Sequence, residues 1–322
     1  MIRYQNAYAQ GGKFSDFHLN LMKFLTKSAP TFIGVRGLGL LANFATKLLG
    51  GTDSVTYVSL LPSAQFAFPT YDSYWSFFVH RNKDYENELT LFFKNIAQQP
   101  FVFIDGGANY GYWSAILSSH EFHSHPCLAI EASEQTFQGL LVTAKANEER
   151  FQCMKRAIWS ESGETVSFAE GGRHAGRHIV DGHIEQMSVN AKLAFTPKDM
   201  IDQVETVSLD DLIHEHFPNH ESFVVKLDIE GAEVNAFEGA KELIEKDSIF
   251  IYEDFGGDRS SEVTSYLLDQ EFQILFPRAD GKLEPITRLD EVENIKRNKR
   301  NGYNFVALKS QGPLSRRILS LI

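Results

Sequence analysis

Residues 101–111 read Phe-Val-Phe-Ile-Asp-Gly-Gly-Ala-Asn-Tyr-Gly, and this stretch decides the fold. An apolar run that ends in an acid, followed by a glycine-rich turn and an amphipathic segment, predicts a buried parallel strand, a tight loop and a helix start. Glycines let a backbone approach a ligand closely, and a helix N-terminus offers unpaired N–H groups. The spacing matches neither the Gly-x-Gly-x-x-Gly of a dinucleotide site nor a P-loop with its Lys-Ser/Thr. The stretch therefore predicts a ligand-binding loop of another kind.

A second motif lies more than a hundred residues downstream. Residues 224–233 read Val-Val-Lys-Leu-Asp-Ile-Glu-Gly-Ala-Glu and again start as an apolar strand. The pair Asp-x-Gly-Ala-Asn-x-Gly and Lys-x-Asp-x-Glu-Gly-Ala-Glu, in this order, resembles the FkbM family of S-adenosylmethionine-dependent methyltransferases over residues 85–309. The chain departs from the family pattern at Gly106, where an apolar residue is usual, and at Ala132, where a proline is usual.

The resemblance implies a Rossmann-like methyltransferase that uses S-adenosyl-L-methionine. FkbM-type enzymes methylate hydroxyls of small molecules such as polyketides and sugars, so the resemblance implies O-methylation of a small-molecule or glycan acceptor. It also implies a set of cofactor-binding residues, which are Asp105, Gly106, Gly107, Ala108, Asn109, Gly111, Glu131, Ala157, Ile158 and Asp228. Because Gly107 is expected to lie against the cofactor, we expect Gly107→Val to abolish cofactor binding and to leave the fold intact.

Apolar strands alternate with amphipathic helices through most of the chain. Strands are expected over 101–105, 127–131, 153–159, 222–228, 249–254, 272–276 and 303–308. Helices are expected over 85–96, 134–145, 208–216, 234–245 and 260–270, and a hairpin turn at 161–164 should lead into a strand at 165–168. This alternation predicts an α/β fold with a doubly wound, mostly parallel seven-stranded sheet and a last antiparallel strand.

The chain divides into three parts on these patterns. Residues 1–84 form an N-terminal extension that we expect to be mostly helical and to serve the substrate pocket or oligomerisation, so a homo-oligomer is one expectation. Residues 85–310 form the methyltransferase domain. Residues 311–322 form a C-terminal tail, and the sequence does not decide whether it docks as a short helix.

Acids close several of the predicted strands, namely Asp105, Glu131, Asp228, Glu253 and Asp254. Ligands of such sheets bind beyond the carboxyl ends of the strands, so we expect these acids to share one site. A carboxylate at the tip of the second strand suits a ribose diol, because each of its oxygens can accept one hydroxyl hydrogen. Glu131 is therefore the expected ribose partner.

Methyl transfer to an alcohol needs a base for the hydroxyl proton. Asp228 and Glu230 are the preferred candidates, with Glu253 and His174 behind them. Acids at a helix start explain Glu233 without any function, and a buried Lys226 should pair with a nearby acid. A divalent cation held by this acidic cluster is the open alternative.

Residues 171–198 are rich in glycine and histidine. One interpretation is a solvated loop; another is a lid in which His174 and Arg177, together with Glu230, meet an anionic or sugar substrate. A zinc site is a third interpretation of the histidines.

Composition excludes other classes of protein. The net charge of −11 argues against nucleic-acid binding, and the basic run 296–300 is expected to be a solvated loop. Cys127 and Cys153 are expected to be buried thiols, and no secretory signal is visible, so we expect a cytoplasmic protein. The segment 31–50 is too polar for a confident membrane span, and a helix packed on the domain or on a second subunit is preferred to membrane contact.

Two other functions compete with the methyltransferase hypothesis. A nicotinamide-dependent oxidoreductase would use a similar loop and strand-tip acid, but the third glycine is missing and Asp105 precedes the loop. A catalytically inactive binding module would keep the fold without turnover. The complete glycine loop and the acid cluster count against this second alternative.

Overall fold

The computed structural model describes residues 2, 4–11, 15–28, 53–169, 201–229, 231–254, 261–297 and 302–322. Its centre is an eight-stranded sheet in the order β13-β12-β14-β11-β10-β4-β5-β6. In that order the strands are Leu283–Ile286, Gln273–Pro277, Asn304–Leu308, Asp247–Glu253, Ser222–Leu227, Val102–Gly106, Cys127–Ile130 and Gln152–Met154. The five strands from β6 to β11 run parallel, and β14 is antiparallel to β11 and β12.

The predicted doubly wound sheet with an antiparallel late strand is confirmed. The eighth strand, β13, was not predicted, because its Pro285 argues against a strand. The structure places this proline on the edge strand, where a missing N–H is tolerated.

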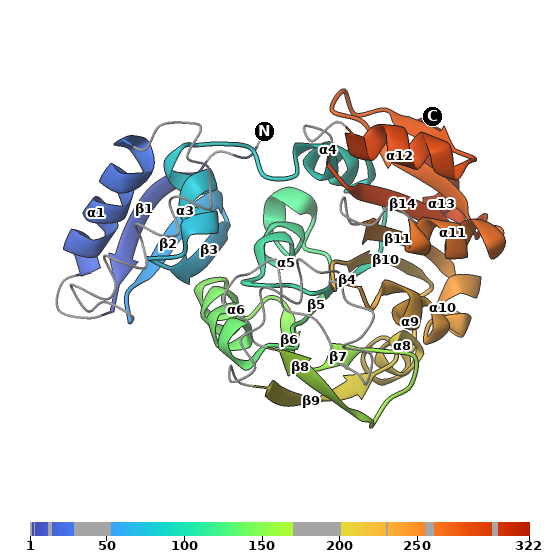
Figure 1. The fold of residues 1–322 in the computed structure, drawn as a ribbon, viewed down its shortest axis with the longest axis horizontal. Coiled ribbons are helices and arrows are strands. Elements are labelled where there is room, and N and C mark those ends of the chain that lie inside the picture. The colour runs from blue at the N-terminus through green and yellow to red at the C-terminus, as the bar shows by residue number, and fades with distance from the viewer. Residues whose placement is uncertain are drawn as a thin grey trace.

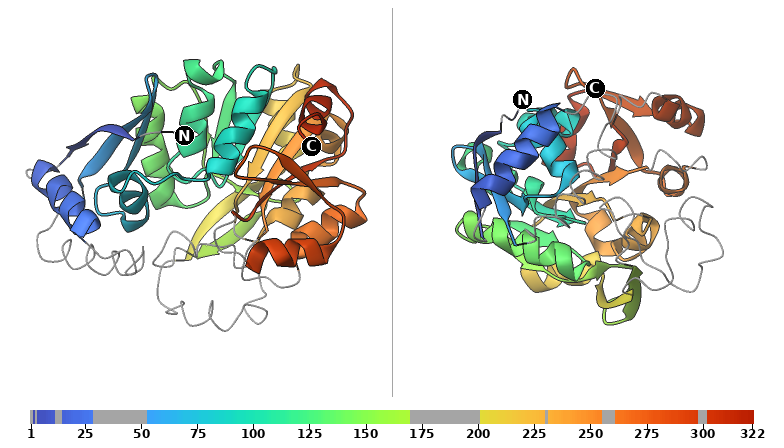
Figure 2. Two further views of the ribbon diagram at one scale, coloured as in Figure 1. Left: turned by 90° about the horizontal axis from the view of Figure 1, so that it is seen from above. Right: turned by 60° about the vertical axis from the view of Figure 1, so that its left-hand side comes forward.

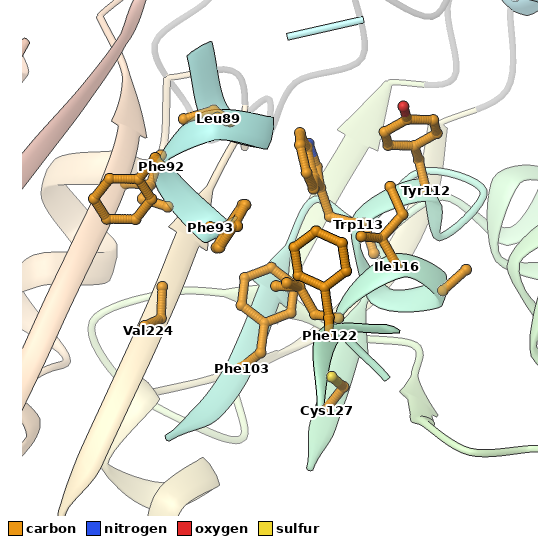
Figure 3. Packing of buried hydrophobic residues seen from close by; sticks show 14 of the residues in the cluster. Leu89, Phe92, Phe93, Phe103, Tyr112, Trp113, Ile116, Phe122, Cys127 and Val224 are labelled. Carbon is orange, nitrogen blue, oxygen red and sulfur yellow. The ribbon is translucent and has the colours of Figure 1, made fainter. Parts of the chain in front are cut away.

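Helices cover both faces of the sheet (Figure 1). One face carries α4 (Asn87–Ile96), α5 (Tyr112–Leu117), α6 (Glu134–Ala146) and α13 (Pro313–Leu319). The other carries α8 (Leu209–His216), α9 (Glu233–Glu238), α10 (Lys241–Glu245), α11 (Glu262–Asp269) and α12 (Leu289–Arg297). Because side chains alternate along a strand, Phe103 enters the first core and its neighbours Val102 and Ile104 enter the second. Figure 3 shows Phe103 packed with Phe93 and Trp113 of the first core.

The N-terminal extension contains a small antiparallel sheet that was not predicted. Its strands are β1 (Gln5–Gln10), β2 (Val55–Leu61) and β3 (Ala64–Pro69), accompanied by helices α1 (Ser15–Ser28) and α3 (Ser73–His80). Seen from above, these elements lie at one end of the molecule and the C-terminal elements at the other (Figure 2, left).

Side chains of α6 join the extension to the methyltransferase domain. Asn147 accepts from the backbone N–H of Gln65 at 2.9 Å and donates to its carbonyl at 2.7 Å. Thr143 exchanges hydrogen bonds of 3.2 Å with the backbone of Ala67 in the same way. These side chains satisfy the outer edge of β3, which would otherwise present unpaired backbone groups.

A second small sheet corrects two predictions. The expected strand 153–159 is divided between β6 of the main sheet and β7 (Ala157–Ile158) of a sheet ordered β7-β9-β8. The expected hairpin at 161–164 is wrong, since β8 (Thr165–Ala169) pairs with β9 (Ile201–Val207) and not with β7. The turn residues identify a reversal of the chain between β7 and β8. They carry no information about β9, the strand that lies between these two in the sheet.

Further differences arise where distant segments meet. The helix expected over 234–245 breaks at Gly239, where a Cβ atom would lie 2.4 Å from the carbonyl oxygen of Trp159. The tail docks as α13, with Asp247 accepting from the backbone N–H groups of Leu314 and Ser315 at 2.7 and 3.0 Å.

Lys296 corrects the prediction for the basic run. Its side chain is 7% exposed and pairs with Asp254, so Lys296 itself is not solvated. Arg297 is 75% exposed, and residues 298–300 lie outside the described residues. Both cysteines are free thiols, and the prediction that they are buried is confirmed for Cys127, whereas Cys153 is only half-buried. Among the described helices, none has both the length and the apolar character needed to cross a bilayer.

Candidate active site

The predicted strand-end acids lie along one edge of the sheet. Asp105, Glu131, Asp228 and Glu253 end or directly follow β4, β5, β10 and β11, which are consecutive neighbours and run parallel. The strand order reverses between β4 and β10, and ligands of such sheets bind at that reversal. The glycine loop that follows β4 lies there.

The glycine loop is clamped between the neighbouring strands. The N–H groups of Gly107 and Ala108 both donate to the carbonyl of Ile130 at the end of β5, at 3.0 and 2.9 Å. On the other side, the N–H of Asp228 donates to the carbonyl of Gly106 at 3.0 Å. Gly107 has φ +72°, and a Cβ atom there would lie 1.9 Å from the carbonyl oxygen of Asp228.

This geometry corrects the expected effect of Gly107→Val. A side chain at this position would push the loop away from Asp228, so the substitution must disturb the sheet edge itself and not only a ligand. Gly106 is similarly confined, since a Cβ there would lie 2.6 Å from Ile158 Cδ1. Gly111 (φ +84°) begins α5, and its Cβ would lie 2.7 Å from Leu140 Cδ1 on α6.

Asp105 fixes the helix that follows the loop. It is 2% exposed and accepts from the backbone N–H and the hydroxyl of Ser114 at 3.1 and 2.6 Å. Burial raises the pKa of Asp105 above its ordinary value, although the nearby Lys226 ammonium and the Ser114 bonds oppose this shift. The described contacts of Asp105 therefore hold α5 against β4.

Glu131 is oriented by two backbone groups. Its Oε2 accepts from the N–H of Asn109 at 3.0 Å, and its Oε1 accepts from the N–H of Ser133 at 2.9 Å. The side chain is nearly buried, at 8% exposed. The glycine loop and Glu131, which follows β5, thus form one hydrogen-bonded unit. Ala157 and Ile158 are buried in β7, and Ile158 lies close to the loop at Gly106.

Lys226 and Asp228 form the ion pair that the sequence predicts. Lys226 Nζ lies 2.9 Å from Asp228 Oδ2, and the two side chains are 4% and 25% exposed. Burial alone would lower the pKa of Lys226, but the carboxylates of Asp228, Glu86 and Asp105 outweigh it and hold that pKa well above its usual value. The ammonium therefore remains charged at neutral pH.

Two tyrosines, Tyr74 of α3 and Tyr85 just before α4, are electrostatic neighbours of these acids. Burial raises the pKa of Tyr74 and Tyr85 well above the usual tyrosine value, and the carboxylates of Glu86, Asp228 and Glu253 raise it further. Both side chains therefore remain neutral phenols at physiological pH. Asp228 and Glu253 follow Leu227 and Tyr252, which are paired in the register of the parallel neighbours β10 and β11, so the two acids stand side by side at the strand ends.

The sequence did not identify Glu86, Tyr74 or Tyr85 as site residues. Glu86 accepts from Trp113 Nε1 at 2.6 Å and from Asn304 Nδ2 at 3.1 Å, and Asn304 is the cross-strand partner of Glu253. No local pattern marks these residues as part of a site, because only tertiary packing brings them to the strand ends.

The remaining predicted residues are Glu230, His174 and Arg177, which lie outside the described residues. Glu233 does more than begin a helix. Its two oxygens accept from the N–H groups of Ile229 and Gly231 at 3.1 and 2.9 Å, which closes the loop after β10. Burial raises the pKa of Glu233 to about 7 in spite of these bonds.

The open alternative of a divalent cation gains no support from the part of the chain that the structure describes. Within that part, no group of three or more His, Cys, Asp or Glu side chains is arranged to hold a metal ion.

Comparison with known proteins identifies the family of the domain that carries these residues. A family model described as the Methyltransferase FkbM domain matches residues 105–274, more than half of the chain. Methyltransferase FkbM from Methylobacillus flagellatus is similar in structure, with a TM-score of 0.40 and 16% identity over 65% of this chain and 43% of that chain. The chain thus spans less than half the length of that protein. Precorrin-6y C5,15-methyltransferase from Geobacter metallireducens gives a TM-score of 0.37 and 12% identity over 69% of this chain and 86% of that chain. No curated protein sequence matches the chain.

Proposed function

Since the chain belongs to the FkbM family of S-adenosylmethionine-dependent methyltransferases, we propose that it methylates a hydroxyl group of a small molecule or of a sugar or glycan. The observation that supports this proposal is the row of carboxylates at the ends of β5, β10 and β11 beside the glycine loop. The carboxylate after β5 suits a ribose diol, and the carboxylate that ends β11 suits an alcohol acceptor that must lose a proton.

The residues present fit the cofactor. S-adenosylmethionine supplies a methyl group on a positively charged sulfur when it is bound. Glu131, held by Asn109 and Ser133, accepts the ribose hydroxyls, and Ile158 borders the same loop on the side assigned to the adenine. The backbone of Asp228 lies directly against Gly106 and Gly107, and its carboxylate pairs with Lys226 where β10 ends beside the glycine loop.

Asp228 is a poor choice of base in this arrangement. Protonation of its carboxylate would leave the buried ammonium of Lys226 without its closest partner, and an uncompensated buried charge is costly. Glu253 ends β11, which is one strand further from the glycine loop than β10. Glu253 and Asp228 both raise the pKa of Tyr74 and of Tyr85. We assign Asp228 to orientation of the cofactor and Glu253 to acceptance of the hydroxyl proton.

The test is transfer of an isotope-labelled methyl group to a library of sugars, glycans and small alcohols, with EDTA-treated enzyme as a parallel sample. Label on a hydroxyl oxygen supports the proposal, and label found only on nitrogen overturns it. Glu253→Gln should lower kcat about 10²–10⁴-fold while cofactor affinity is kept. Asp228→Asn should weaken cofactor binding, and Glu245→Gln, on the exposed side of α10, is the matched control. Wild-type kcat in Glu253→Gln would remove that residue from the mechanism.

A further inference from the structure

The helix α3 of the extension sends two consecutive side chains toward the site. Tyr74 neighbours the acids Asp228 and Glu253, whereas Trp75 reaches the glycine loop. The start of α3 is fixed by Asp72, whose Oδ1 accepts from the N–H of Trp75 at 2.9 Å. The backbone of Trp75 is therefore anchored before its side chain enters the domain.

Aromatic packing fixes the ring of Trp75. The ring is 2% exposed and stacks on Tyr112 of α5 at 5.4 Å with an interplanar angle of 21°. It also meets Phe66 of β3 at 4.6 Å and Tyr85 at 4.8 Å. Its only polar atom, Nε1, donates to Asn109 Oδ1 at 3.2 Å. A buried indole N–H usually finds such a partner, and here the partner belongs to the ligand-binding loop.

Asn109 is the point where this contact acts on the loop. It adopts the left-handed conformation, with φ +52°, which asparagine tolerates better than most residues. Its Oδ1 accepts from Trp75 and from the N–H of Tyr110 at 2.9 Å, and its own N–H donates to Glu131 Oε2 at 3.0 Å. A continuous chain of hydrogen bonds thus runs from Trp75 through Asn109 to Glu131.

We propose that Trp75 is a positioning residue of the cofactor site, through which the N-terminal sheet sets the affinity for the cofactor. The indole N–H holds the carboxamide of Asn109, which also accepts from the N–H of Tyr110. The side chain of Asn109 is thereby fixed on both sides, and the backbone N–H of the same residue aims the Glu131 carboxylate. The extension then contributes to cofactor binding as well as to the acceptor side. This inference rests on the assignment of Glu131 to the ribose and is independent of the acceptor.

The experiment measures binding of S-adenosylhomocysteine by calorimetry, which needs no acceptor, so failure of the hydroxyl proposal does not affect it. Trp75→Phe keeps an aromatic ring and removes the N–H. Asn109→Gly keeps the left-handed backbone and removes the acceptor oxygen. Because a neutral hydrogen bond contributes modestly, each variant should weaken binding about 3–10-fold. The double variant should be no weaker than the weaker single variant, because both changes break the same link.

Phe66→Leu is the control for packing. It disturbs the ring against which Trp75 lies and leaves the N–H in place, so it should lower the melting temperature without a change in affinity. Additive losses in the double variant, unchanged affinity in Asn109→Gly, or an equal loss of affinity in Phe66→Leu would each overturn the proposal.

Discussion

The ammonium of Lys226 lies 2.9 Å from the carboxylate of Asp228, at the point where β10 ends beside the glycine loop. The lysine side chain is almost fully buried, and its charge is balanced by Asp228, Glu86 and Asp105 together. This pair joins the stability of the fold to the electrostatics of the site, because the same ammonium neutralises acids from the start of α4, from β4 and from the end of β10.

Lys226→Met should therefore be strongly destabilising. Removal of one partner of a buried ion pair typically costs about 3–5 kcal/mol, since the remaining charges lose their compensation. Lys246→Met is the matched control, because Lys246 pairs with the exposed Glu221, and a surface pair contributes about 1 kcal/mol or less. Free energies of unfolding from urea titrations give the comparison. Equal losses in the two variants would show that Lys226 is not the electrostatic centre of the site.

Gly107 and Gly163 have nearly the same φ, so substitutions at these two positions distinguish the cost of backbone strain from the cost of steric overlap. Gly107 (φ +72°) lies against Asp228, whereas Gly163 (φ +82°) has no atom within 4 Å of its absent Cβ. Gly163→Ala should cost about 1–2 kcal/mol, the price of a left-handed alanine. Gly107→Ala adds an overpacking term of about 1–3 kcal/mol and should also abolish binding of S-adenosylhomocysteine. Thermal unfolding of both variants measures the difference. Equal melting temperatures would contradict the conclusion that Gly107 is clamped against Asp228.

Glu131→Gln tests the assigned ribose partner. The amide keeps the size of the side chain and loses the negative charge, and hydrogen bonds to charged groups contribute about 1.5–3 kcal/mol. Binding of S-adenosylhomocysteine should weaken about 10–100-fold. Glu134→Gln, at the start of the next helix and paired with Lys155 near the surface, should bind like the wild type. A change of less than twofold in Glu131→Gln would place the ribose elsewhere.

The raised pKa of Glu233 predicts how the free energy of unfolding varies with pH. Its pKa in the folded protein is about 7, whereas an unfolded glutamate titrates near about 4.3. The folded state therefore binds the proton more tightly, so this contribution to stability is complete below about pH 4.3 and is lost as pH rises toward about 7. At about 1.4 kcal/mol for each unit of pKa shift, the loss is about 2–4 kcal/mol.

The amide in Glu233→Gln cannot titrate, so the variant should lack this loss of stability as pH rises. Urea titrations of the ligand-free protein at pH 5 and pH 8 should show the wild type losing stability relative to the variant. Glu245→Gln, exposed on α10, should follow the wild type. Parallel pH profiles for wild type and Glu233→Gln would mean that Glu233 is ionised throughout this range.

The sheet and its row of acids were predictable because both depend on local patterns. Buried parallel strands read as apolar runs, and Asp105, Glu131 and Asp228 stand where those runs end. The direction of each side chain then follows from the alternation along a strand.

Other features depend on contacts between distant segments, and the sequence could not reveal them. Trp75 belongs to a stretch without a motif, and it reaches the site because β3 packs on α5 and α6. Glu86 stands at the start of a predicted helix, and only its contacts with Trp113 and Asn304 connect it to the site. Lys296 looked like part of a solvated run until α12 placed it against Asp254. The glycines of the loop were expected to make room for a ligand, and Gly107 proves to make room for the backbone of Asp228.

The pairing of Ala169 with Ile201 has an evolutionary consequence. Opposite residues of an antiparallel ladder lie about 5 Å apart, so the chain leaves and re-enters the small sheet almost at one point. In general, a segment whose two ends lie this close can change length at little cost, about 0.6 kcal/mol for each doubling of a flexible loop. A change in the number of residues between Ala169 and Ile201 can therefore leave the register of β8 and β9 unaltered.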